Sequence, residues 1–190
     1  MRTLFAASLT LLLASTTMAS SSHAQPILRF RNVVGVITAL GVDNPVCGTD
    51  AQGNCVGTTI HSGTFAWVAR DGNARVNLST GAASFQVDGL VINGTQFSGT
   101  PGPVTQVEGT LVCNLGGGGG PEAILDTAPV SLSSQGDAEF SGQIAGIPAT
   151  CDNPRFLIRI VTPAGALGAW IATGTEPSTG RVMGLQNEGE

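Results

Sequence analysis

Lysine and tyrosine are absent from this 190-residue sequence, and charged residues of any kind are scarce. Charged side chains make up 11% of the chain, whereas about a quarter is typical of soluble domains. Thirteen acidic residues outnumber eight basic ones, all of them arginine, and the formal net charge is −5. Because the basic residues form no cluster, nucleic acids and anionic membrane surfaces are not expected as partners.

Amphipathic helices are also missing. An exposed helix needs Glu, Lys, Arg and Gln on its solvent face, and the 27 glycines suit short strands and tight turns instead. Alternating apolar and polar residues predict half-buried antiparallel strands over residues 27–40, 83–93, 104–114, 123–134, 137–147, 155–162 and 168–173. The predicted fold is an all-β antiparallel β-sandwich, immunoglobulin-like or jelly-roll, with a β-barrel as the alternative.

One hairpin is predicted in detail, over residues 64–79. Asp71 and Gly72 are typical of a two-residue type I′ turn. Pairing the flanking strands about this turn gives one wholly apolar face and one mostly polar face, which favours that register. Trp67 then lies opposite Val76 on the apolar face and is expected in the core.

The N-terminus has the pattern of a secretory signal. Arg2 precedes an apolar segment of about ten residues, too short to span a bilayer. Ser22-His23-Ala24 fits the small-x-small cleavage rule, with cleavage before Gln25. No later apolar run is long enough to cross a membrane. We therefore expect a signal peptide over residues 1–24, one all-β domain over 25–175, a polar tail over 176–190, and a secreted, extracellular or periplasmic location.

Four cysteines follow that signal, and an even number in an exported chain favours disulfides. Of the three connectivities, Cys47 with Cys55 and Cys113 with Cys151 is predicted. The first pair brackets turn-forming residues, and the second ties the end of one predicted strand to the start of another. Zinc-like spacing and a C-x-x-C redox motif are both absent.

Calcium is the one metal for which the sequence offers candidate ligands. Asp43, Asn44, Asp50 and Asn54 carry oxygens, but they lack the EF-hand order and its bidentate glutamate. The favoured interpretation is a solvent-exposed turn closed by the Cys47–Cys55 disulfide. Neither a metal nor a cofactor is predicted.

The sequence shows no complete catalytic set. His61 is the one histidine after the predicted signal, and no G-x-S-x-G motif accompanies it or the adjacent Ser62. Carboxylates on several strand segments have no defined mutual separation, and we expect them on the solvent-facing side of a sheet: Asp88, Glu108, Asp126, Asp137 and Glu139.

These features favour a non-catalytic β-sandwich module that binds a partner or builds a surface assembly. A surface protein, a glycan or further copies of the chain would fit as partners, since unprotected edge strands recruit other strands. Trp170 is the candidate contact residue. The alternative is a glycosidase-like hydrolase on a jelly roll, with carboxylates converging in a groove beside an exposed Trp170.

Overall fold

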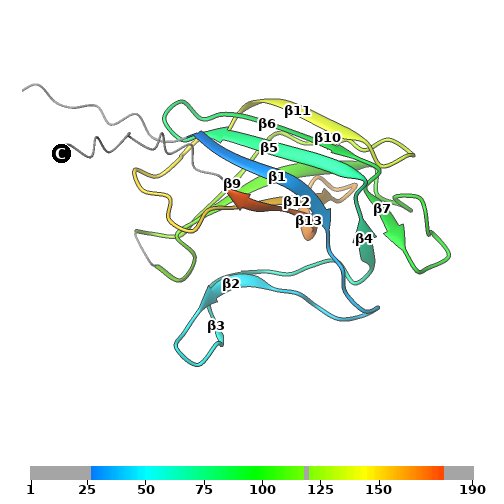
Figure 1. Cartoon of the computed structure of the whole chain (residues 1–190), viewed down its shortest axis with the longest axis horizontal. Coiled ribbons are helices and arrows are strands. Elements are labelled where there is room, and N and C mark those ends of the chain that lie inside the picture. Colours follow the sequence, from blue (N-terminus) through cyan, green and yellow to red (C-terminus); the bar gives the residue numbers. More distant parts are fainter. Residues whose placement is uncertain (1–26, 118–119, 178–190) are drawn as a thin grey trace, which may run out of the picture.

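The protein is an all-β structure (Figure 1). The computed structural model describes residues 27–117 and 120–177, which contain thirteen strands, one short 3₁₀ turn and no α-helix. The strands are β1 (Ile27–Gly35), β2 (Val46–Thr49), β3 (Cys55–Ile60), β4 (Ala66–Val68), β5 (Asp71–Asn77), β6 (Ala82–Asp88), β7 (Val91–Asn93), β8 (Gln106–Cys113), β9 (Ala123–Asp126), β10 (Val130–Ser131), β11 (Ala138–Gln143), β12 (Arg155–Val161) and β13 (Leu167–Pro177); the 3₁₀ turn is η1 (Leu115–Gly117). All ladders between these strands are antiparallel, which confirms the predicted fold class.

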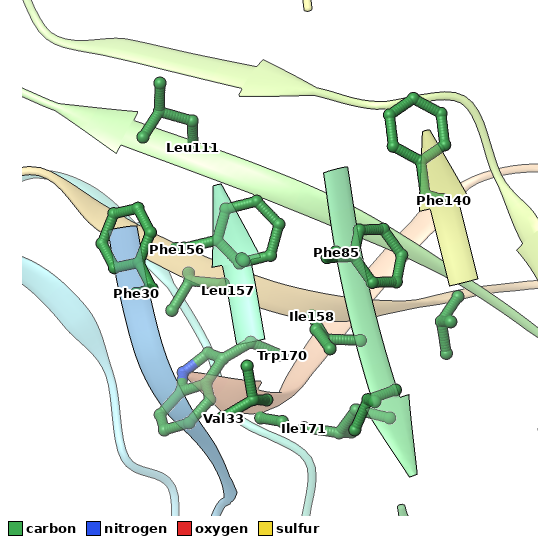
Figure 2. Close-up of a cluster of buried hydrophobic side chains, with 14 of the residues drawn as sticks. Phe30, Val33, Phe85, Leu111, Phe140, Phe156, Leu157, Ile158, Trp170 and Ile171 are labelled. Carbon is green, nitrogen blue, oxygen red and sulfur yellow. The ribbon is translucent and has the colours of Figure 1, made fainter. Parts of the chain in front are cut away.

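One sheet dominates the molecule and curls around the hydrophobic core. Its strands run in the order β10-β8-β12-β13-β1-β5-β6-β11, and β9 also pairs with β8. Three strands separate β6 from β12 in this order, yet the rings of Phe85 (β6) and Phe156 (β12) have centroids 5.8 Å apart (Figure 2). The ring centroid of Phe30, in β1, lies 5.6 Å from that of Phe156. The two facing layers expected of a sandwich are therefore two limbs of one curled sheet, one formed by β8, β12 and β13 and the other by β5, β6 and β11, with β1 between them.

Strand β1 lies at the bend and changes partner along its length. Residues 27–31 pair with β5, whereas residues 30–35 pair with β13. The β13 register shifts on both sides of Arg31, and Asn32 has a φ of 56°, in the left-handed region that Asn tolerates better than most residues. A β-bulge of this kind increases local twist, so a single strand can serve both limbs.

The predicted hairpin of residues 64–79 is wrong. β4 pairs with β7, and β5 pairs with β6 and β1. The β5–β6 register, with Asp71 opposite Asp88, continues unchanged into the β4–β7 ladder, with Val68 opposite Val91. Residues 66–77 and 82–93 are thus the two arms of one long, interrupted hairpin.

Close packing explains why Asp71 and Gly72 do not form the turn. A Cβ on Gly72 would lie 2.7 Å from the Cβ of Val33 and 3.0 Å from the carbonyl oxygen of Gln86, so this glycine permits close approach within the sheet. The chain turns instead between Asn77 and Gly81. The Asn77 side chain accepts hydrogen bonds from two following backbone N–H groups, and Gly81 has a φ of 75°.

Both predicted disulfides are present. Cys47 and Cys55 have Cα atoms 5.5 Å apart and close the β2–β3 hairpin. Cys113 and Cys151, with Cα atoms 4.7 Å apart, join the end of β8 to the segment that precedes β12. The sequence reasoning about turn formers and strand ends therefore identified the correct connectivity.

Glu122 fastens the β2–β3 hairpin to the rest of the domain. Its carboxylate accepts hydrogen bonds from the backbone N–H groups of Thr58 (2.9 Å) and Gly116 (2.7 Å), which lower the pKa of Glu122. Gly48 packs so closely on η1 that a Cβ there would overlap the Gly116 backbone. Polar and steric contacts thus hold this hairpin in place.

None of the described residues forms a helix long and apolar enough to cross a membrane. The predicted signal peptide of residues 1–24 lies outside the described residues, as does the predicted tail from residue 178 onward. Strand β13 runs to Pro177, two residues past the predicted domain boundary at 175.

Replacing Gly72 with alanine is expected to lower the free energy of unfolding by about 1–3 kcal/mol, because the added methyl group overlaps Val33 and a backbone carbonyl in a well-packed layer. Urea unfolding measures the loss. Gly168→Ala is the matched control, since Gly168 also lies in a strand and its added Cβ would have no contact closer than 3.4 Å. Equal losses in the two variants would contradict this role for Gly72.

Candidate functional site

An apolar groove of about 430 Å³ opens where the two limbs of the curled sheet meet at one end. Five parts of the chain supply its wall: residues 62–65 with Trp67, Ile92 of β7, residues 103–105 before β8, residues 160–163 at the end of β12, and Ala169 of β13. Since these parts are far apart in sequence, the groove exists only once the sheet has curled.

The groove wall carries no charged residue. Its polar side-chain groups are the four hydroxyls of Ser62, Thr64, Thr105 and Thr162 and the indole N–H of Trp67, and the wall is otherwise mainly apolar. Small-molecule pockets in proteins typically have volumes of about 300–1,000 Å³ and this kind of lining. The groove is therefore suited to a neutral, largely apolar group.

Trp67 gives the groove its largest side chain and an unpaired hydrogen-bond donor. The residue is 1% exposed, which confirms its predicted place in the core. Within residues 27–117 and 120–177, no group accepts a hydrogen bond from its Nε1. A Cβ on Gly63, which also lines the groove, would lie 3.5 Å from that nitrogen. The missing side chain of Gly63 thus leaves space for a ligand oxygen near the donor.

Backbone hydrogen bonds hold the wall segment of residues 62–67. The N–H of Gly63 donates to the carbonyl of Trp170 (2.8 Å), and the N–H of Trp170 donates to the carbonyl of His61 (3.0 Å). The N–H of Trp67 donates to the carbonyl of Val36 at 2.8 Å. The segment is therefore tied both to β13 and to the chain that follows β1.

Asp43 braces the same wall from the segment between β1 and β2. Its carboxylate accepts a hydrogen bond from the backbone N–H of Ser62 (2.9 Å) and contacts Nδ1 of His61 at 2.5 Å. The His61 contact is the main reason that the pKa of Asp43 is lowered. The backbone N–H of Asn44 donates to Ser62 Oγ at 2.8 Å. These bonds fix the position of Ser62 at the edge of the groove.

The Asp43, His61 and Ser62 cluster lacks the contact that defines a catalytic triad. A triad serine passes its hydroxyl proton to the histidine, whereas the Ser62 hydroxyl bonds the Gly63 carbonyl (3.1 Å) and the Asp43 carboxylate (3.3 Å). The role of the cluster is structural: it holds the groove wall in position, and we call it the brace. No local sequence signal identifies it, because Asp43 and His61 lie on opposite sides of the β2–β3 hairpin.

The residues considered for calcium do not converge on one point. Asp43 braces the groove wall, and Asn44 bonds that wall through its backbone. The Asp50 carboxylate closes its own turn by accepting hydrogen bonds from Asn54 and Gln52, and these lower the pKa of Asp50. In the part of the chain that the structure describes, no three His, Cys, Asp or Glu side chains are grouped to hold a metal ion.

Trp170 does not present an open ring to a partner. The residue is 7% exposed, and its Nε1 donates to the carbonyl oxygen of Asn44 at 2.9 Å. A residue that stacks on a sugar needs an accessible ring face, so Trp170 is better described as a buried link between β13 and the segment before β2.

The candidate carboxylates form two groups, and neither group lines the apolar groove. Asp88, Asp137 and Glu139 surround a shallow hollow of about 260 Å³. There the Asp137 carboxylate accepts a hydrogen bond from the backbone N–H of Gly89 at 2.9 Å. The second group contains Glu108 of β8 and Asp126 of β9.

Glu108 is a buried carboxyl group on β8, which lies between β12 and the edge strands β9 and β10, and its predicted solvent-facing position is wrong. The residue is 7% exposed and lies opposite Arg159 of β12. The Asp126 carboxylate lies 4.0 Å from the Arg159 guanidinium and accepts a hydrogen bond from Thr110 at 2.6 Å. Burial, reinforced by the negative charge of Asp126, raises the pKa of Glu108 to about 7, and Arg159 opposes this only in part.

A pH-dependent stability follows from the raised pKa of Glu108. Since the folded-state pKa of about 7 exceeds the usual 4.5, the folded protein binds this proton more tightly than the unfolded chain does. The resulting contribution to the free energy of unfolding is complete below pH 4.5 and is lost as the pH rises through about 7. Wild type should lose on the order of 2 kcal/mol over this window.

Glu108→Gln should remove that loss, as measured by urea unfolding at several pH values. Glu139→Gln is the control, because Glu139 is exposed on β11. If Glu108→Gln retains the same pH dependence as Glu139→Gln between pH 4.5 and 7, Glu108 is not its source.

No protein-family model matches this chain, and no curated protein or solved structure matches it either. Its function therefore has to be inferred from the chemistry of the groove, the brace and the buried carboxyl group.

Proposed function

We propose that this chain is an exported, non-catalytic binding module whose ligand or partner inserts a neutral, apolar group into the apolar groove. The observation that carries the proposal is the groove itself, about 430 Å³ in volume, with a mainly apolar wall and no charged residue in that wall. Apolar surface removed from water in such a concave site supplies the free energy of binding.

The indole N–H of Trp67 adds a site for an acceptor. It has no acceptor among the described residues, yet it is not a fully buried unsatisfied donor, so it is accessible from the groove and a ligand oxygen there would gain a hydrogen bond. Gly63 leaves room near the nitrogen for such a group. An amide, ester or ketone carbonyl on an otherwise apolar ligand combines both properties.

Glycans and ions fit the groove less well. A sugar carries many hydroxyl groups and favours exposed aromatic rings, whereas Trp67 is 1% exposed. A charged group would lose its hydration in a site whose wall offers no opposite charge. An apolar ligand or an apolar segment of a protein is therefore the favoured partner.

The two disulfides support the exported part of the proposal. Disulfides persist in oxidising locations such as the extracellular space and the periplasm, and the described residues hold no free cysteine. The signal-like pattern of residues 1–24 points the same way.

A carboxylate-based hydrolase is the second candidate, favoured by one observation. Glu108, with a pKa of about 7 beside Asp126, has the protonation expected of a glycosidase general acid. However, Glu108 is 7% exposed, and neither carboxylate lies in the groove wall. We favour the binding module because its site is open and the carboxylate pair is not.

Nile red, a neutral dye that carries a carbonyl group and fluoresces in apolar surroundings, tests the groove. We expect saturable binding of one dye per chain. Ala169→Leu fills part of the groove and should weaken binding about tenfold or more. Ala82→Leu is the matched control, since Ala82 is exposed on β6 outside the groove wall. Equal dye affinities of the two variants would contradict the proposal.

Nuclear magnetic resonance supplies an internal control for the same titration. The described chain has two indole N–H groups, of which that of Trp170 is already bonded to Asn44. The dye should shift the Trp67 indole resonance and leave that of Trp170 in place.

A further inference from the structure

The segment between β1 and β2 exposes several large apolar side chains. Ile37 is 83% exposed, Leu40 is 70% exposed and Val42 is 48% exposed. We call residues 37–42 the apolar turn. Apolar side chains gathered on a surface mark an interaction site more often than scattered single ones do.

Local hydrogen bonds give the apolar turn a defined shape. The N–H of Val42 donates to the carbonyl of Ala39 at 3.0 Å, and Gly41 has a φ of 80°, as in a type II β-turn. The hydroxyl of Thr38 donates to the Val42 carbonyl at 2.8 Å. Leu40 is therefore held at the tip of an ordered turn.

The apolar turn lies directly beside the apolar groove. The N–H of Gly41 donates to the carbonyl of Thr64 at 3.0 Å, and Thr64 is part of the groove wall. An exposed apolar turn and a concave apolar surface thus adjoin each other in the fold.

We propose that the groove receives the apolar turn of a second copy of this chain, so that two copies pair reciprocally. This inference rests on the proposed function and names its partner. Because turn and groove adjoin, a twofold axis beside Thr64 would let each copy insert its turn into the other. Such an isologous contact closes as a dimer and does not continue into a filament.

Size and charge both support this pairing. A cavity of about 150 Å³ is enough for benzene, so a groove of about 430 Å³ has room for the side chains of Ile37 and Leu40 together. Residues 37–42 carry no charge, and neither does the groove wall. Insertion therefore buries no unpaired charge.

Hydrogen bonding supports it as well. No described residue donates to the Leu40 carbonyl, which lies at the tip of the turn. The Trp67 indole N–H in the groove lacks an acceptor. The incoming turn thus carries a carbonyl group that could accept a hydrogen bond from this donor.

Sedimentation equilibrium of the purified chain, from micromolar to millimolar concentration, tests the pairing. We expect wild type to dimerise and Leu40→Asp to weaken dimerisation about tenfold or more, because the carboxylate would enter a groove without a countercharge. Ala51→Asp is the matched control, since Ala51 is exposed between β2 and β3 and gains the same charge. Dimerisation should also shift the Trp67 indole resonance and not that of Trp170.

Three results would overturn the pairing. The first is a wild type that stays monomeric throughout, and the second is equal dimerisation constants for Leu40→Asp and Ala51→Asp. The third is a monomer that sediments with phosphatidylcholine vesicles through Leu40, which would assign the turn to a membrane. Nile red separates this inference from the proposed function: dye binding without dimerisation removes the pairing alone, whereas a monomer that binds no dye removes both.

Discussion

The curl of the main sheet around Phe156 is the constraint on which the rest of the structure depends. Strand β1 pairs with β5 along its first half and with β13 along its second, and the bend near Asn32 turns one limb onto the other. Phe30 and Phe85 then pack on Phe156 from two directions (Figure 2). The β4–β7 ladder extends one limb, and the connection from β12 to β13 ends the other; the groove lies between them. An open, uncurled sheet would leave the same residues on separate surfaces.

Short sequence patterns predicted the features that depend on residues close together in the chain. Alternation located most strands, and the turn formers between Cys47 and Cys55 indicated that disulfide. The hairpin prediction failed because two turn signals compete: Asp71 with Gly72, and Asn77 with Gly81. The choice between them depends on Val33, which packs against the open side of Gly72 from a strand almost forty residues earlier. No short stretch of sequence around Gly72 includes Val33, so the local pattern could not decide between the two turns.

The candidate site was less predictable, since its parts meet only in the folded chain. The groove wall draws on five segments, and the brace joins Asp43 to His61 across an intervening hairpin. Glu108 shows a different limit. Alternation places its side chain on a solvent face, but β8 is buried from residue 107 to residue 113, on both faces of the sheet. The nearly continuous apolar run that follows Glu108 was the available signal, because strands buried on both sides lose their alternation.

Stability alone does not explain why the groove remains open. Packing accounts for Gly63, because a Cβ there would lie 3.3 Å from the Cγ2 methyl of the fully buried Ile171, but it does not account for Ala169. Ala169 borders unfilled space where a larger apolar side chain would add buried surface. The small side chain of Ala169 and the large apolar side chains of the apolar turn left in water both depart from what packing favours. Such departures are expected where a surface serves a function, and here they lie close together, since the apolar turn is hydrogen-bonded to the groove wall through Gly41 and Thr64.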